Sequence, residues 1–135
     1  MSGAFLDSNV LLYTLSTNDP RQTTAIRVVA QGGTISVQVL NEFASVAYRK
    51  LKLSWPEVER ALAAVRALCP PPRPLTLATH EAAVALASRH GLAFYDALIV
   101  ASALEAGCAT LLSEDMQDGR VIEGRLTIRD PFRVE

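Results

Sequence analysis

The 135-residue sequence has only two cysteines and no long uninterrupted hydrophobic run. Cys69 and Cys108 are too few for a disulfide framework or a zinc cluster, so we expect a thiol-reducing compartment. No basic segment followed by a long apolar stretch opens the chain, and no signal peptide is expected. The longest clean apolar run, residues 97–104, is far too short to cross a bilayer. These absences favour a cytoplasmic protein.

Excess charge of either sign is also lacking, because 13 cations and 14 anions leave a net charge of −1. Overall charge therefore gives the chain no general attraction for nucleic acid. Eleven of the 13 cations are arginines, however, and the guanidinium group suits phosphate. Arg49, Lys50 and Lys52 form the one compact basic group. They are either the solvated end of a helix, where cations suit the helix dipole, or a guide for an anionic substrate.

Half of the residues are hydrophobic, which is enough for a core in a chain of this length without disulfide or metal support. We expect a single domain over residues 1–135. Expected strands cover residues 4–6, 34–37, 75–77, 109–113 and 126–128. Expected helices cover residues 10–15, 21–30, 39–51, 55–68, 80–90 and 95–106. This alternation predicts an α/β fold whose mainly parallel sheet has helices on both faces.

Local signals mark several element ends. Ser8 or Asn9 is the expected cap of the first helix, and Thr79 that of the fifth. Ser54, followed by Glu57, forms a capping box for the fourth helix. The proline-rich segment 69–74 and residues 117–124 are expected to be loops.

Four acidic residues stand where strands end or where the next helices begin. Asp7 directly follows the first expected strand, and Asp115 lies two residues beyond the end of the fourth. Glu42 and Asp96 lie in the first turns of expected helices. Ligands of open α/β sheets bind outside the carboxyl ends of the strands, so these four carboxylates can share one crevice.

Each acid also has a purely structural interpretation. Asp7 could begin a turn, Asp96 could cap its helix, and Asp115 could lie in a polar surface turn. Glu114 and Asp118 are interpreted as surface residues on their own sequence context. Taken together, however, carboxylates about 4 Å apart repel by about 4 kcal/mol per pair at an effective dielectric near 20. A shared crevice would therefore need a cation, and oxygen donors favour Mg²⁺ or Mn²⁺ over zinc.

Four segments together resemble a known family. They are FLDSNVLLY at residues 5–13, NEF at 41–43, YDALIVA at 95–101 and LLSED at 111–115. In this order and spacing they look like the PIN-domain nucleases, and within these like the VapC toxins of bacterial VapBC toxin–antitoxin modules. The resemblance covers nearly the whole chain, except for the tail after Gly119.

The resemblance implies a three-layer α/β/α fold and a magnesium-dependent ribonuclease. It implies that the acidic quartet Asp7, Glu42, Asp96 and Asp115 is catalytic. One or two ions would be held by three of these acids, and Glu42 would orient or deprotonate the attacking water. Small polar residues near the metal would be Asn9, Ser113 and Asp118. The implied partners are an RNA substrate, which Arg49, Lys50 and Lys52 could guide, a cognate antitoxin and a second copy of the chain.

Two other functions remain open at this stage. A phosphotransferase would use the strand-end Asp7 as nucleophile, but it would want a second aspartate where Asn9 stands. A binding module could keep the fold and contact RNA or protein without cutting, although a pure phosphate binder has no use for four carboxylates. The apolar stripe of the helix at residues 56–68 is either core or a groove for a partner's helix.

Overall fold

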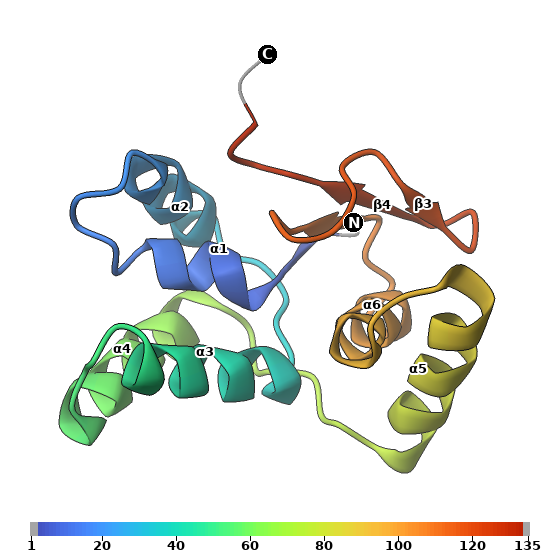
Figure 1. The fold of residues 1–135 in the computed structure, drawn as a ribbon, viewed down its shortest axis with the longest axis horizontal. Coiled ribbons are helices and arrows are strands. Elements are labelled where there is room, and N and C mark those ends of the chain that lie inside the picture. Colours follow the sequence, from blue (N-terminus) through green and yellow to red (C-terminus); the bar gives the residue numbers. More distant parts are fainter. Residues whose placement is uncertain (1–2, 134–135) are drawn as a thin grey trace.

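The computed structural model describes residues 3–133 and places a four-stranded sheet beside two groups of helices (Figure 1). The sheet has the order β1-β2-β4-β3, formed by β1 (Ala4–Leu6), β2 (Thr110–Leu112), β4 (Leu126–Arg129) and β3 (Val121–Ile122). β1, β2 and β4 are parallel, and only β3 runs antiparallel to its neighbour. The α/β class with a mainly parallel sheet is therefore confirmed.

The helices within the described residues are α1 (Ser8–Tyr13), α2 (Arg21–Ala30), α3 (Val37–Arg49), α4 (Trp55–Leu68), α5 (Leu77–His90) and α6 (Phe94–Glu105). Helices α1 to α4 pack as one group, and α5 packs against α6 as a second group (Figure 1). The first group follows β1 in the chain and the second precedes β2, against which α6 packs.

Two predicted strands are wrong. Residues 34–37 form only isolated bridges, Thr34 with Phe5 and Ser36 with Arg73, because Ser36 accepts a hydrogen bond from the Val39 N–H and caps α3. Residues 75–77 are not a strand either. Thr76 and Thr79 exchange the two hydrogen bonds of a capping box, so α5 begins at Leu77 and its cap is Thr76 rather than Thr79.

Other boundaries differ by a few residues. The first helix begins at Ser8 rather than residue 10, because the cap is Asp7 and not Ser8 or Asn9. The short strand β3 lies inside the expected loop 117–124. The capping box of Ser54 with Glu57 is confirmed, as is the end of α4 at Leu68.

Helix α6 is the central helix of the core, since seven consecutive residues from Ala97 to Ala103 are buried. Such a helix has no polar face, as its sequence predicts. The apolar stripe on α4 is partly core and partly exposed. Val58 and Val65 are buried, whereas Leu68 is 51% exposed. Among residues 3–133 no single helix is long and apolar enough to cross a membrane. Helices α5 and α6 meet the requirements of length and composition only when taken together, and the pair is bent by 115°.

Close packing of β1 against Gly33, in the turn after α2, generates a stability prediction. A Cβ atom on Gly33 would lie 2.8 Å from Cγ of Leu6, which is fully buried. We expect Gly33→Ala to lower the free energy of unfolding by about 1–3 kcal/mol, because the core has no room for the methyl group. Gly3→Ala is the matched control, since nothing lies within 4 Å of its Cβ position. Equal urea midpoints for the two variants would contradict this packing.

Candidate acidic active site

Asp7 lies at the carboxyl end of β1 and is only 3% exposed. Its Oδ1 accepts a hydrogen bond from the Ser8 N–H at 2.7 Å, and its Oδ2 accepts one from Ser113 Oγ at 2.7 Å. Burial raises the pKa of Asp7 to about 6, and the charges of Glu42 and Asp96 add to this effect against the two hydrogen bonds. The chain therefore holds a carboxylate in a position where its ionisation is unfavourable.

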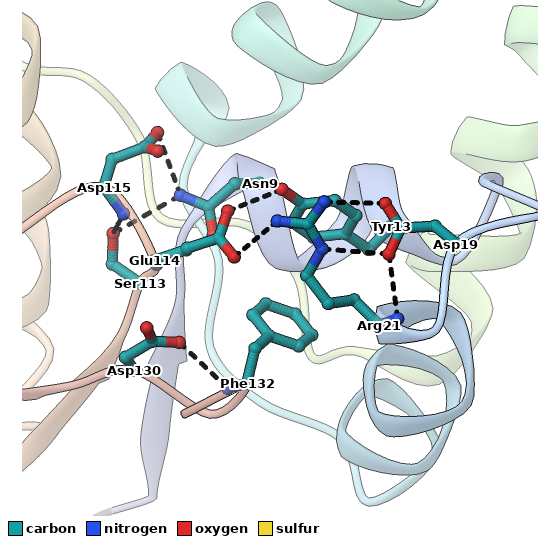
Figure 2. A network of polar contacts seen from close by, with 9 residues as sticks. All are labelled: Asn9, Tyr13, Asp19, Arg21, Ser113, Glu114, Asp115, Asp130 and Phe132. Atoms are coloured by element: carbon teal, nitrogen blue, oxygen red, sulfur yellow. Dashed lines mark hydrogen bonds and ion pairs between the residues drawn. The ribbon is translucent and has the colours of Figure 1, made fainter. Parts of the chain in front are cut away.

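Asn9 contacts Asp7 and also the segment after β2, and Figure 2 shows its contacts with Ser113, Glu114 and Asp115. Its Nδ2 donates to Asp115 Oδ2 at 3.1 Å and lies 3.4 Å from both Asp7 Oδ2 and Ser113 Oγ. The Glu114 N–H donates to Asn9 Oδ1 at 3.1 Å, which turns the amide nitrogen toward the acids. The partial positive charge of this amide thus lies between two carboxylates.

Glu42 reaches the same region from α3. Its Oε1 accepts a hydrogen bond from Ser8 Oγ at 2.9 Å, and its Oε2 accepts one from Gln38 Nε2 at 3.0 Å. Gln38 is buried and lies one helical turn before Glu42, so both carboxylate oxygens are held by neutral donors. These hydrogen bonds orient the Glu42 side chain without placing a cation beside it.

Asp96 is the third residue of α6 and does not cap it, because Ala93 is the N-cap and no side chain makes the cap hydrogen bond. Burial raises the pKa of Asp96, and the charges of Glu42 and Asp115 raise it further. Each of the four predicted acids therefore acts electrostatically on at least one other, although they come from β1, α3, α6 and the loop after β2.

Two of these acids, Glu42 and Asp115, line a cleft of about 580 Å³, which we call the acidic cleft, and Asp7 and Asp96 are not among its lining residues. Its lining includes Ser8, Asn9, Glu42, Tyr95 and Asp115, together with Arg49 and Lys50. Arg49 lies seven residues after Glu42 on α3, about 10 Å along the helix and on the same side. Lys52 does not line the acidic cleft but lies in a second hollow with Tyr48, Arg49 and Leu53. The predicted basic group thus extends over two hollows, and Arg49 lines both.

Two acids on the loop that carries Asp115 are paired with cations. Glu114, interpreted from the sequence as a surface residue, forms an ion pair with Arg21 at 2.8 Å and accepts a hydrogen bond from Tyr13. Asp118 accepts hydrogen bonds from the Asp130 N–H and from Arg133, and it has no hydrogen bond to the quartet. Within residues 3–133, none of the four acids of the quartet takes part in a salt bridge.

The donor set fits a hard divalent cation in its chemistry. It offers carboxylate and hydroxyl oxygens, an unpaired buried Asp7, and no thiol or imidazole. The described residues contain no group of three acidic, histidine or cysteine side chains that already encloses an ion position.

Sequence analysis missed two residues that position the acids, Ser8 and Gln38. The i, i+4 spacing of Gln38 and Glu42 on one helix could have indicated their pairing. No comparable sequence signal connects Ser8 to Glu42, which is 34 positions away. It also missed the network of Tyr13, Arg21 and Glu114 that Figure 2 shows beside Asn9.

Comparisons with known proteins agree with this architecture. The family model of the PIN domain matches residues 4–119. No curated protein matches the sequence significantly. Among solved structures, the chain is similar to the sarcin-ricin loop cleaving toxin VapC20 of Mycobacterium tuberculosis, with 23% identity, a TM-score of 0.68, and 83% of this chain and 91% of that chain covered.

Two further solved structures come from toxin–antitoxin systems. A toxin–antitoxin complex from Klebsiella pneumoniae has 21% identity and a TM-score of 0.71, with 97% of this chain and 99% of that chain covered. VapBC2 from Rickettsia felis, bound to a DNA fragment from its promoter, has 18% identity and a TM-score of 0.64, with 94% and 98% covered. At these identities the likeness supports the fold.

The raised pKa of Asp7 predicts a pH-dependent stability in the absence of divalent ions. Its folded pKa of about 6 lies above the ordinary value of 3.8, so its favourable contribution is complete below that value and is lost as the pH rises through 6. The shift corresponds to about 3 kcal/mol. Between about pH 4 and about pH 8, the free energy of unfolding of Asp7→Asn should therefore rise relative to the natural protein by most of this amount.

Urea unfolding in EDTA measures this difference, and Asp118→Asn is a control of opposite sign. The Asp130 N–H lowers the pKa of Asp118, so the ionised carboxylate stabilises the fold of the natural protein. The free energy of unfolding of Asp118→Asn should therefore fall relative to the natural protein as the pH rises. If the difference in free energy of unfolding between Asp7→Asn and the natural protein did not change with pH, burial would not raise the pKa of Asp7.

Proposed function

The chain belongs to the PIN domain family, and from this premise we propose that it is a divalent-metal-dependent ribonuclease that acts as the toxin of a toxin–antitoxin pair. The observation that carries the proposal is the acidic quartet, two of whose members line the acidic cleft. Its four carboxylates act on one another without a salt bridge among the described residues, and two of them have raised pKa values. Such an arrangement is unfavourable for the fold alone and suits the binding of a cation.

In this proposal Asp7, Asp96 and Asp115 hold magnesium, or manganese in its place, while Asn9 and Ser113 keep Asp7 and Asp115 in position. Magnesium, when bound, supplies positive charge that offsets the acids and polarises a phosphodiester group. The basic side chains Arg49 and Lys50, which line the same cleft, attract the RNA backbone. An RNA strand thus meets cations at one part of the cleft and the acids at another.

Glu42 is the proposed general base. Ser8 and Gln38 orient its two oxygens, and its exposure is intermediate, so a water molecule from the cleft can reach it. Glu42 accepts a proton from that water as the oxygen bonds to phosphorus. The bond from phosphorus to the leaving oxygen then breaks, and that oxygen takes up a proton. The products are two shorter RNA strands, without a covalent enzyme intermediate.

The contacts of Asp7 disfavour the phosphotransferase alternative. A nucleophilic carboxylate must reach an incoming phosphorus atom, but both oxygens of Asp7 already accept hydrogen bonds from Ser8 and Ser113, and the residue is 3% exposed. Asn9 stands where a second aspartate is wanted, and its amide donates toward Asp7. The geometry suits a ligand oxygen better than an attacking one.

The proposed protein partner is an antitoxin whose apolar helix covers the hollow of about 220 Å³ between α2 and α4. Ile26 and Leu68 line this hollow and are half exposed, which is unusual for large aliphatic side chains. We also propose a single PIN domain over residues 1–135 and a homodimer. The similarity to the Klebsiella complex, which extends over 97% of the chain, supports the single domain.

Cleavage of RNA tests the enzymatic proposal directly. The purified protein should cut a structured RNA in the presence of magnesium, and EDTA should stop the reaction. Asp7→Asn should remove cleavage, since it deletes a ligand charge, and Glu42→Gln should lower the rate by roughly 100-fold or more, since it deletes the base. The rates follow from gel analysis of an end-labelled RNA.

Glu59→Gln is the matched control, because Glu59 is exposed on α4, away from the acidic cleft, and loses the same charge. It should cut as fast as the natural protein. Undiminished cleavage by Asp7→Asn would make the ligand assignment wrong, and cleavage that persists in EDTA would make the metal dependence wrong.

Magnesium should also stabilise the fold, because it binds the assembled site and not the unfolded chain. At ten times the dissociation constant the gain is about 1.4 kcal/mol, which raises the melting temperature by several degrees. Asp7→Asn should show no such rise, whereas Glu59→Gln should match the natural protein. Differential scanning calorimetry with and without magnesium checks this, and equal magnesium shifts for all three proteins would contradict binding at Asp7.

A further inference from the structure

Two exposed aromatic side chains stack on each other at the turn between α3 and α4. The rings of Tyr48 and Trp55 lie 4.1 Å apart between centroids and are inclined by only 10°. Tyr48 is 44% exposed and Trp55 is 52% exposed. Stacking uses one face of each ring, so substantial aromatic surface remains in contact with solvent. Neither the core nor the acidic cleft explains this exposure.

Cations surround the stacked pair. Arg49 and Lys52 line a hollow of about 480 Å³ together with Tyr48 and Leu53, and Lys50 lies beside them in the chain. All three cations are exposed, and none forms a salt bridge within residues 3–133. We call Tyr48, Trp55, Arg49 and Lys52 the α3–α4 platform.

The α3–α4 platform continues the acidic cleft. Arg49 lines both hollows, and Tyr48 lies six residues beyond Glu42, about 9 Å along α3. In Figure 1 the turn between α3 and α4 lies on the opposite side of the molecule from α5. A strand that places a phosphodiester at the acids can therefore run along α3, past Arg49, onto the aromatic pair.

We propose that the α3–α4 platform binds an unpaired base of single-stranded RNA by stacking, a few nucleotides away from the bond that is cut. The proposal rests on the proposed ribonuclease function and extends it to a second contact with the substrate. An aromatic face accepts any base, and unpaired cations beside it hold the adjoining phosphates. An apolar protein partner would bury the rings but would leave the charges of Arg49 and Lys52 without anions.

The backbone at Lys52 allows fold and binding to be separated. Lys52 has a φ of 60°, a left-handed conformation that favours glycine over a residue with a side chain. Lys52→Gly therefore removes a cation and relieves strain at once. It should raise the melting temperature and weaken RNA binding, two effects that a purely structural role would not combine.

Trp55 is the only tryptophan of the chain, so its fluorescence reports on the platform directly. We expect a 12-nucleotide single-stranded RNA, added in EDTA to prevent cleavage, to quench this fluorescence and to bind less tightly at higher salt. Fluorescence anisotropy of a labelled RNA extends the measurement to variants. Trp55→Phe should bind nearly as the natural protein does, because it keeps an aromatic face, whereas Trp55→Leu should bind roughly tenfold more weakly.

Arg66→Gln is the matched charge control, because Arg66 is exposed on α4 but lines neither hollow, and it should leave affinity unchanged. Unaltered fluorescence at saturating RNA, or equal affinities of Trp55→Leu and Trp55→Phe, would overturn the proposal. Loss of a dimer by Trp55→Leu without loss of RNA affinity, seen by light scattering, would assign the surface to a protein contact instead.

The cleavage experiment keeps the two proposals distinct. The ratio of kcat/KM for the 12-nucleotide RNA to that for a dinucleotide should fall in Trp55→Leu, and an unchanged ratio would contradict the platform. A protein that quenches on RNA addition but never cuts would refute the ribonuclease function and leave the platform standing.

Discussion

The concentration of negative charge at the carboxyl end of the parallel strands is the constraint on which the site depends. Asp7 is buried, and the charges of Glu42 and Asp96 act on it, yet within residues 3–133 no cation is paired with these acids. A fold selected for stability alone would neutralise or expose such groups. Here neutral donors hold the carboxylate oxygens in place instead of cations.

The distribution of ion pairs sharpens this interpretation. Arginine side chains pair with Glu114 and Asp118, which lie on the loop after β2, whereas the only side-chain donor to the Asp115 carboxylate, between them in the sequence, is the amide of Asn9. The chain has 11 arginines, so the lack of a partner at Asp115 reflects their placement rather than their number. On this loop, the ion pairs of Glu114 and Asp118 distinguish them from the candidate ligand Asp115, although the three acids are close together in the sequence.

Local sequence predicted the elements whose signals are local. The apolar run of α6 and the capping box of α4 predict these two helices. The four acids are predicted as a group because ligands bind at the carboxyl ends of parallel strands. The failures involve competition between alternatives of similar strength: the β-branched segments near Thr34 and Thr76 suit a strand, but side-chain caps at Ser36 and Thr76 favour a helix start. Contacts such as Ser8 with Glu42 depend on helix packing, which no short segment encodes.

The buried carboxylate of Asp7 is held in place by a series of side-chain contacts, which we call the relay. Arg21 pairs with Glu114 and stacks over the ring of Tyr13, which packs edge-on against Phe132. Glu114 is held in this way, and its backbone N–H orients Asn9. The relay joins α1, α2, the loop after β2 and the C-terminal segment, so the position of Asp7 is supported by elements from both ends of the chain. Repulsion among the acids is thus opposed by tertiary packing rather than by a local cation.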